Sequence, residues 1–183
     1  CFKNIWVSSD DEKILKISER YGAEIIKRPK NISGDISSSE SAWLHALNYI
    51  RKKKFNVDLI FSPQVTSPLR TKYDIIESIK LFCKENYDSM FSCNTYSALT
   101  LWSKEKNSFK SINYDYKNRK IRQKINNQYV ENGSFYSFLP NTLIKYNNRF
   151  GKKIGCYEMD IWKLIEIDDF DQLNLCKILM KNY

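Results

Sequence analysis

The sequence predicts an α/β fold built on a mostly parallel sheet that is flanked by helices. Residues 5–7 form a short apolar strand, a helix follows from about residue 10 to residue 21, and residues 23–27 form a second strand. Gly22 ends the helix between them. A strand, a helix and a strand in such quick succession indicate parallel pairing, because parallel neighbours need a crossover connection.

Polar side chains mark the starts of two helices. Ser9 and Glu12 have the spacing of a capping box, in which each side chain accepts a hydrogen bond from the other residue's amide. Three serines end a polar loop before an amphipathic helix over residues 40–53, where they either cap the helix or cradle an anion or nucleotide. The single histidine, His45, lies in this helix, so we expect it to be packed and expect no histidine-based metal site.

Length and composition fit one domain over residues 1–183, truncated at its amino-terminal end. No apolar run approaches the roughly 20 residues that span a bilayer. The five cysteines have no C-x-x-C spacing, which argues against a disulfide framework and a zinc site and favours a reducing cytoplasm. With no visible export signal, the sequence predicts cytoplasmic localisation and no membrane partner.

The net charge of +9 raises the question of nucleic-acid binding. The run Arg51 to Lys54 closes a predicted helix, where cations complement the helix dipole, and other lysines are scattered among asparagines and tyrosines. We interpret the excess as solvated surface that attracts an anionic small substrate, and expect no nucleic-acid partner.

The central candidate for binding is the segment from Phe61 to Arg70. An apolar strand over residues 57–61 ends there in a polar loop broken by Pro63 and Pro68. Ligands of open α/β sheets bind just beyond the carboxyl ends of strands, which places Gln64, Thr66, Ser67 and Arg70 at a recognition loop. An ordinary connection to the next helix, over residues 73–84, is the alternative.

Residues 95–129 interrupt the sheet pattern, after a strand over residues 90–93, with polar, tyrosine-rich and basic sequence. This insert is interpreted as a lid, a dimerisation arm or a flexible surface feature. Its basic run, from Lys117 to Arg122, offers the best local site for phosphate contact.

The carboxyl-terminal third supplies a pair of acids. Strands are predicted over residues 129–136, with a turn or bulge at Asn132-Gly133, and over residues 152–159 and 163–167, while Pro140 opens a short helix. Strand alternation would send the carboxylates of Glu166 and Asp168 to one side, where two acids can hold Mg²⁺. Asp169 is expected to cap the last helix instead.

In order and spacing, these motifs resemble the acylneuraminate cytidylyltransferases, also called CMP-sialic acid synthetases. Each motif is weak alone, but the ordered set spans nearly the whole chain. The matching elements are Val7 to Asp10 with Arg28-Pro29, Asp35 and Ser39 before the helix of His45, Gln64 to Arg70, Arg122-Gln123, Asn132-Gly133 with Tyr136, and Glu166 to Asp168.

The resemblance implies a Rossmann-like domain whose insert is an arm exchanged between the subunits of a homodimer. It implies transfer of CMP from CTP to a nine-carbon acidic sugar with release of pyrophosphate, for surface polysaccharide biosynthesis, with Mg²⁺ as cofactor. Arg28 and Ser39 would contact the nucleotide. The residues implied for the sugar site are Gln64, Thr66, Ser67, Arg122, Asn132 and Tyr136. Glu166 and Asp168 would be the catalytic, metal-binding acids with Arg122 beside them, although the family usually has aspartate at position 166.

Two departures from the family pattern leave alternatives open. The family's amino-terminal glycine- and serine-containing phosphate loop has no counterpart among the five glycines of this sequence. A noncatalytic nucleotide- or sugar-binding homologue, or an inactive fragment, is therefore the alternative function, with a basic nucleic-acid binder as a third. Trp102 and Val130 stand where some sialic-acid enzymes have basic residues, so legionaminic-type acids are expected as readily as N-acetylneuraminic acid.

Overall fold

The computed structural model describes residues 2–182, which form two compact units. Unit 1 comprises the chain up to Pro63 together with Thr71–Phe91 and Tyr136–Gly155. Unit 2 comprises Gln64–Arg70, Ser92–Phe135 and the chain from Cys156 onward. Three strands have residues in both units, and each unit is described by itself. The expected single domain stays a prediction.

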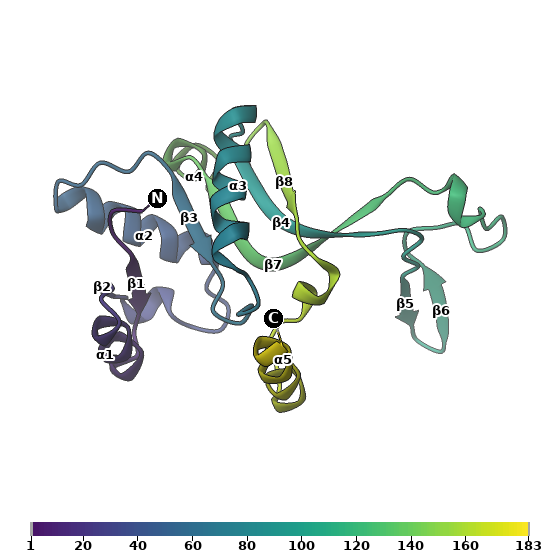
Figure 1. The fold of residues 1–183 in the computed structure, drawn as a ribbon, viewed down its shortest axis with the longest axis horizontal. Coiled ribbons are helices and arrows are strands. Elements are labelled where there is room, and N and C mark those ends of the chain that lie inside the picture. The colour runs from purple at the N-terminus through teal and green to yellow at the C-terminus, as the bar shows by residue number, and fades with distance from the viewer. Residues whose placement is uncertain (1, 183) are drawn as a thin grey trace. The chain divides into compact units, whose positions relative to one another are not determined.

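Unit 1 begins with the predicted strand, helix and strand. Strands β1 (Trp6–Ser9) and β2 (Glu24–Lys27) pair in parallel, and helix α1 (Glu12–Arg20) packs against both of them (Figure 1). Gly22 follows the helix with a φ of +82°, a conformation that residues with a Cβ adopt only with strain. The predicted parallel connection is confirmed.

The capping box expected between Ser9 and Glu12 is wrong. The helix is capped by Asp11, whose carboxylate accepts hydrogen bonds from the amides of Lys13 at 2.6 Å and Ile14 at 3.2 Å. Ser9 instead accepts from the amide of Asp11 at 3.1 Å. A carboxylate is preferred because its charge interacts favourably with the helix dipole.

The core of unit 1 lies under helices α2 (Ser39–Lys52) and α4 (Pro140–Tyr146), which contact each other. Its buried cluster is Leu47, Tyr136, Phe138 and Leu143, with aromatic neighbours around it. Arg149 lies 4.7 Å from the ring centre of Trp43 and 4.3 Å from that of Tyr136, and its Nε donates to Glu40 at 2.9 Å. A cation is therefore held among aromatic rings at the start of α2.

The central sheet has the order β3 (Ile60–Pro63), β7 (Gln128–Phe138), β4 (Ser89–Tyr96), β8 (Ile154–Glu158). Helix α3 (Lys72–Glu85) begins at a capping box formed by Thr71 and Asp74. Together with the parallel pair β1–β2, this arrangement confirms the predicted α/β class.

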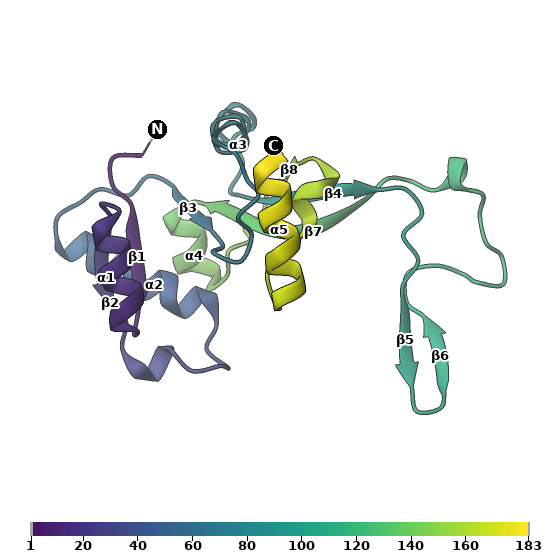
Figure 2. The same cartoon turned by 60° about the horizontal axis from the view of Figure 1, so that its bottom comes forward.

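In unit 2 the predicted insert leaves between β4 and β7. Its strands β5 (Trp102–Glu105) and β6 (Ser108–Ser111) form an antiparallel hairpin, and Figures 1 and 2 show this hairpin standing away from the strands that carry the insert. Trp102 contacts the rings of Tyr114 and Tyr116, with centroids 5.7 and 5.6 Å apart. The insert thus carries an aromatic cluster of its own.

The strand predicted over residues 163–167 is wrong. A short 3-10 helix, Ile161–Leu164, occupies this place and leads through an extended segment to helix α5 (Phe170–Asn182). Asn94 donates from its amide to the carbonyls of Met159 at 2.7 Å and Asp160 at 2.8 Å. These side-chain contacts end β8 and turn the chain, so alternation does not orient the acids that follow.

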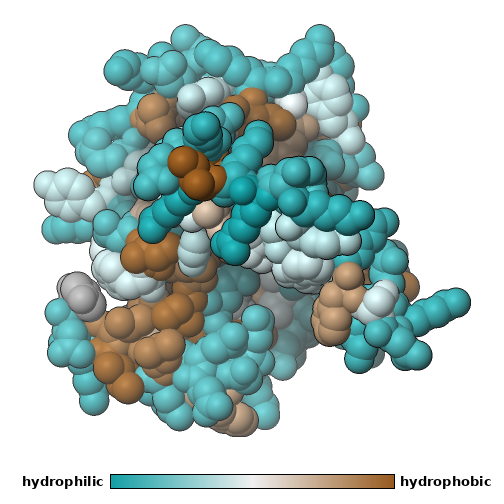
Figure 3. All heavy atoms as spheres, turned by 90° about the vertical axis from the view of Figure 1, so that its right-hand side faces the viewer, coloured by the Kyte–Doolittle hydropathy of each residue, from teal (hydrophilic) through white to brown (hydrophobic). Residues whose placement is uncertain are grey.

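The face drawn in Figure 3 is largely hydrophilic, with groups of apolar side chains exposed on it. No helix in the described part of the chain is both long enough and apolar enough to cross a membrane. Cys83, Cys93, Cys156 and Cys176 are free thiols.

The Glu40–Arg149 pair makes the stability of unit 1 depend on pH. Burial raises the pKa of Glu40, but the hydrogen bond and charge of Arg149 outweigh it and hold that pKa below its ordinary value. A lowered folded-state pKa adds stability above the unfolded pKa, and that stability disappears as the pH falls through the folded value. Glu40→Gln should therefore lower the free energy of unfolding by about 1–2 kcal/mol near neutral pH.

The difference between Glu40→Gln and the wild type should shrink in denaturant titrations below about pH 4. Glu77→Gln removes an exposed pair with Lys80 and serves as the control, with no measurable loss expected. A Glu40→Gln deficit that stayed constant from neutral pH to pH 3 would contradict the assignment.

Candidate functional site

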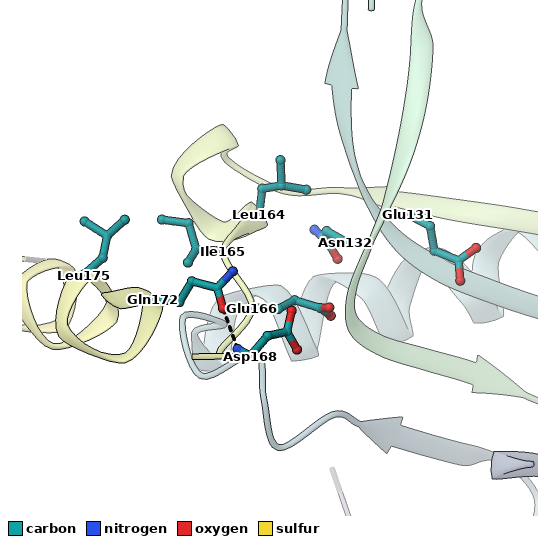
Figure 4. A pocket seen from close by; sticks show the side chains of 8 residues that line it. All are labelled: Glu131, Asn132, Leu164, Ile165, Glu166, Asp168, Gln172 and Leu175. Carbon is teal, nitrogen blue, oxygen red and sulfur yellow. Dashed lines mark hydrogen bonds between the residues drawn. The ribbon is translucent and has the colours of Figure 1, made fainter. Parts of the chain in front are cut away.

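A pocket of about 460 Å³ lies wholly within unit 2 (Figure 4). Its walls come from strand β7, from the segment between the last 3-10 helix and α5, and from the first turns of α5. The lining residues are Glu131, Asn132, Leu164, Ile165, Glu166, Asp168, Gln172 and Leu175. The predicted acid pair therefore shares one pocket, although no strand aligns it.

The pocket is acidic on one side and aliphatic on the other. Figure 4 shows Glu166 and Asp168 extending towards the same part of the pocket, whereas the carboxylate of Glu131 points away from them. The described residues contain no group of three or more metal-ligating side chains. Two carboxylates suit a hard cation such as Mg²⁺, which completes its coordination with water and phosphate oxygens.

Glu166 is held in a notch formed by Ser67 and Gly133. The hydroxyl of Ser67 donates to Oε1 of Glu166 at 3.1 Å. Gly133 has a φ of +63°, and a Cβ added there would stand 1.6 Å from the same oxygen. Ser67 is only 1% exposed and does not line the pocket, and its hydroxyl contacts Glu166 of the acid pair. Its contact with the sugar stays a prediction.

The recognition loop Gln64–Arg70 is fixed by its own arginine. Nη1 of Arg70 donates to the carbonyls of Gln64 at 2.9 Å, Ser67 at 2.5 Å and Ser134 at 3.1 Å. Burial lowers the pKa of Arg70 by removing the guanidinium from water. The amide of Ile167 donates to the carbonyl of Thr66 at 2.8 Å. Arg70 and this backbone bond tie the loop to β7 and to the acid segment.

Asp168 is oriented by the start of α5. The side-chain oxygen of Gln172 accepts hydrogen bonds from the amides of Asp168 at 2.5 Å and Asp169 at 3.0 Å, and the first of these is drawn in Figure 4. The carboxylate of Asp169 accepts from the amide of Gln172 at 2.8 Å. This reciprocal capping box confirms the capping interpretation of Asp169. Gln172 was not predicted, although its place three residues after Asp169 is the signal that finds it.

Asn132 lines the pocket but its amide is used internally. The side chain is 2% exposed and donates to the side chain of Asn94 at 2.9 Å and to the sulfur of Met159 at 3.5 Å, while its oxygen accepts from the amide of Ser134 at 3.1 Å. The last of these hydrogen bonds joins the two residues that flank Gly133. Asn132 therefore shapes the strand at the notch, and its contact with substrate stays a prediction.

Three other predicted residues belong to unit 1. Nη2 of Arg28 donates to the carbonyl of Ser8 at 3.0 Å, and its buried Nε has no hydrogen-bond partner. Ser39 is exposed at the first turn of α2, where Ser38 supplies the cap. Tyr136 is 5% exposed and packs in the core. The structure gives Tyr136 a packing role, and the nucleotide contacts of Arg28 and Ser39 stay predictions.

Arg122 lies on the insert and does not line the pocket of unit 2. It is exposed, and its Nε donates to the hydroxyl of Ser97 at 2.8 Å. The three aliphatic residues that do line the pocket are Leu164, Ile165 and Leu175. They were missed because the first two belong to the strand predicted over residues 163–167 and the third to the apolar pattern of the last helix.

The contacts of Arg70 generate a direct test. Arg70→Ala removes three charge-assisted hydrogen bonds, and the carbonyl of Ser67 loses its donor while those of Gln64 and Ser134 keep a backbone amide, so we expect the free energy of unfolding to fall by about 2–3 kcal/mol in chemical denaturation. Lys72→Ala, an exposed cation two residues further, is the control and should change little. Equal stability of the two variants would show that the loop is not held by Arg70.

No family model matches this chain. It is 33% identical over 170 residues to "N-acylneuraminate cytidylyltransferase A" of Danio rerio, covering 91% of this chain and 38% of that protein. It is 27% identical to "Post-translational flagellin modification protein B" of Campylobacter coli, covering 98% of this chain and 78% of the relative. A "Pseudaminic acid cytidylyltransferase" of Campylobacter jejuni is 25% identical, covering 98% and 79%.

Solved structures share the fold at low identity. A CMP:2-keto-3-deoxy-manno-octonic acid synthetase complexed with CTP aligns with a TM-score of 0.65 at 14% identity, over 98% of this chain and 81% of its own. The 4-diphosphocytidyl-2C-methyl-D-erythritol synthase of Anaerococcus prevotii aligns with a TM-score of 0.62 at 13% identity, over 98% and 82%. The resemblance drawn from the ordered motifs is thus confirmed, and this chain is a homologue of the acylneuraminate cytidylyltransferases.

Proposed function

We propose that this chain is a nucleotidyltransferase that transfers CMP from CTP to a nine-carbon acidic sugar and releases pyrophosphate. The observation that carries the proposal is the acid pair, Glu166 and Asp168, in one pocket of unit 2. These two residues stand where the related cytidylyltransferases are expected to have their metal-binding acids. The names of two relatives, for N-acylneuraminate and pseudaminic acid, support the sugar class.

Charge supports a divalent cation at this pocket. Three carboxylates and no lysine or arginine line it, so a triphosphate entering alone would be repelled. Glu166 and Asp168 would hold Mg²⁺, which neutralises the phosphates and the leaving pyrophosphate when bound. The side-chain oxygen of Gln172 accepts a hydrogen bond from the backbone amide of Asp168 and so keeps Asp168 in place. Ile165 and Leu175 form an apolar part of the pocket lining.

The sugar carboxylate requires a cation that the pocket lining lacks. We propose Arg122 for this role, because a guanidinium binds a carboxylate through two parallel hydrogen bonds. Arg122 lies outside the lining of its own pocket, on an insert that exposes Trp102, Phe109, Ile112 and Tyr116. An insert with this surface suits a homodimer in which Arg122 of the partner subunit completes the site.

The proposed transfer of CMP is tested with the full-length protein. With CTP and Mg²⁺, pyrophosphate release should appear with at least one of N-acetylneuraminic, legionaminic and pseudaminic acids. The eight-carbon 2-keto-3-deoxy-octonic acid is the control, because it probes the substrate named for the structural neighbour. Silence with all nine-carbon acids would overturn the proposal, and calorimetric binding of CMP without turnover would replace it with a binding module.

The acid pair is tested by Asp168→Ala. Turnover should fall about 100-fold or more because the cation loses a ligand, while the thermal midpoint stays near the wild-type value. Asp171→Ala removes an exposed acid from the first turn of the same helix and is the control, with turnover retained. A parallel loss of stability and activity in Asp168→Ala would return this residue to a capping role.

The dimer is tested by complementation. Arg122→Ala and Asp168→Ala should each be inactive alone. After mild dissociation and mixing of the two variants, about half of the dimers contain one subunit of each kind, and one of the two sites in such a dimer has both native residues. The mixture should therefore regain about one quarter of the turnover of the same amount of wild-type protein. Light scattering measures the mass of each variant. Failure to regain activity in verified mixed dimers would place Arg122 in its own subunit's site or outside the reaction.

A further inference from the structure

We propose that Ser67 and Gly133 are positioning residues that hold Glu166 for cation binding, and that their notch is shaped for glutamate. The inference rests on the proposed function, because it concerns the same pocket. It assigns Ser67 and Gly133 a role in which neither touches the substrate.

The first step is the hydrogen bond of Ser67. Its hydroxyl donates to Oε1 of Glu166 at 3.1 Å, and the serine is 1% exposed, so water does not replace the bond readily. A hydrogen bond to a carboxylate is stronger than one between neutral groups. Ser67 therefore restrains one oxygen of the carboxylate that lines the pocket.

The second step is the space left by Gly133. A Cβ at this position would stand 1.6 Å from Oε1 and 2.8 Å from the carboxyl carbon of Glu166. The carboxylate thus fills the volume that any other residue would need. The φ of Gly133, +63°, is also a backbone conformation that residues with a Cβ adopt only with strain.

The third step is the rigidity of the notch. Arg70 donates to the carbonyl of Ser67 and to that of Ser134, the residue that follows Gly133. The amide of Ile167 is bonded to the carbonyl of Thr66 at 2.8 Å. These three hydrogen bonds restrain the backbone of the notch. The side chain of Glu166 therefore loses little further conformational entropy when it binds a cation.

The length of Glu166 follows from these contacts. Aspartate is shorter by one methylene, about 1.5 Å, and cannot reach Ser67 from the same backbone. Glutamate at this position is therefore matched to the serine and the glycine that receive it, and the three residues act as one unit.

The experiment measures Mn²⁺ affinity by electron paramagnetic resonance, with Mn²⁺ as the probe and no turnover required. Ser67→Ala, Gly133→Ala and Glu166→Asp should each weaken binding by roughly 10-fold or more, as loss of an outer-shell contact does. Ser78→Ala, at a serine that is equally buried but bonded within α3, is the matched control for Ser67. Gly22→Ala is the control for Gly133, because Gly22 has a positive φ and nothing within 4 Å of its Cβ position.

Unchanged affinity in Ser67→Ala and Gly133→Ala, with loss in Glu166→Gln and Asp168→Asn, would overturn the positioning role and leave the proposed metal pair intact. Full Mn²⁺ binding in Glu166→Gln and Asp168→Asn would overturn the metal pair itself. A stability cycle of Ser67→Ala, Glu166→Gln and the double variant adds a metal-free readout. Additive effects in that cycle would show that the hydrogen bond is not formed, and non-additive effects support the notch.

Discussion

The hydrogen bonds of the Arg70 guanidinium are the interactions on which the recognition loop of unit 2 depends. Three carbonyls, from Gln64, Ser67 and Ser134, accept hydrogen bonds from one nitrogen, which joins the recognition loop to strand β7 beside the backbone hydrogen bond from Gln64 to Ser134. A buried cation with carbonyl partners costs desolvation, which its lowered pKa reflects. That cost is offset by three hydrogen bonds to backbone carbonyls, of which those of Gln64 and Ser134 also accept from the backbone amides of Ser67 and Gln64.

The position of the acid pair follows from this anchor. Ser67 donates to Glu166 while Arg70 donates to the carbonyl of Ser67, and the capping box of α5 separately orients Asp168 through Gln172. The two carboxylates are thus brought to one pocket by two different local structures, a loop and a helix start. Neither depends on strand pairing, which explains how the pair forms without the strand expected over residues 163–167.

Charge acts on two length scales. The chain carries a net charge of +9, which favours the approach of anionic ligands from solution. The pocket itself is lined by three acids, which at short range favour a cation and disfavour a bare anion. The proposed Mg²⁺ would lie between the carboxylates of this pocket and the anionic nucleotide.

The sequence by itself determined the α/β class, the parallel β1–β2 pair around α1, the insert, the capping role of Asp169 and the family resemblance. These features depend on periodicity, turn residues and ordered motifs, which are local and so can be recognised along the chain. The cap at Asp11 was missed because Ser9 offered an alternative acceptor with the spacing of a capping box. The chain path after Met159 was missed because it depends on the distant amide of Asn94, which donates to the carbonyls that follow β8. Only the tertiary structure decided which motif residues share the pocket. Ser67 and Glu166 are 99 residues apart in the sequence. Tyr136 packs in the core of unit 1 among its aromatic neighbours. Such contacts are set by how segments pack, and no local pattern encodes them.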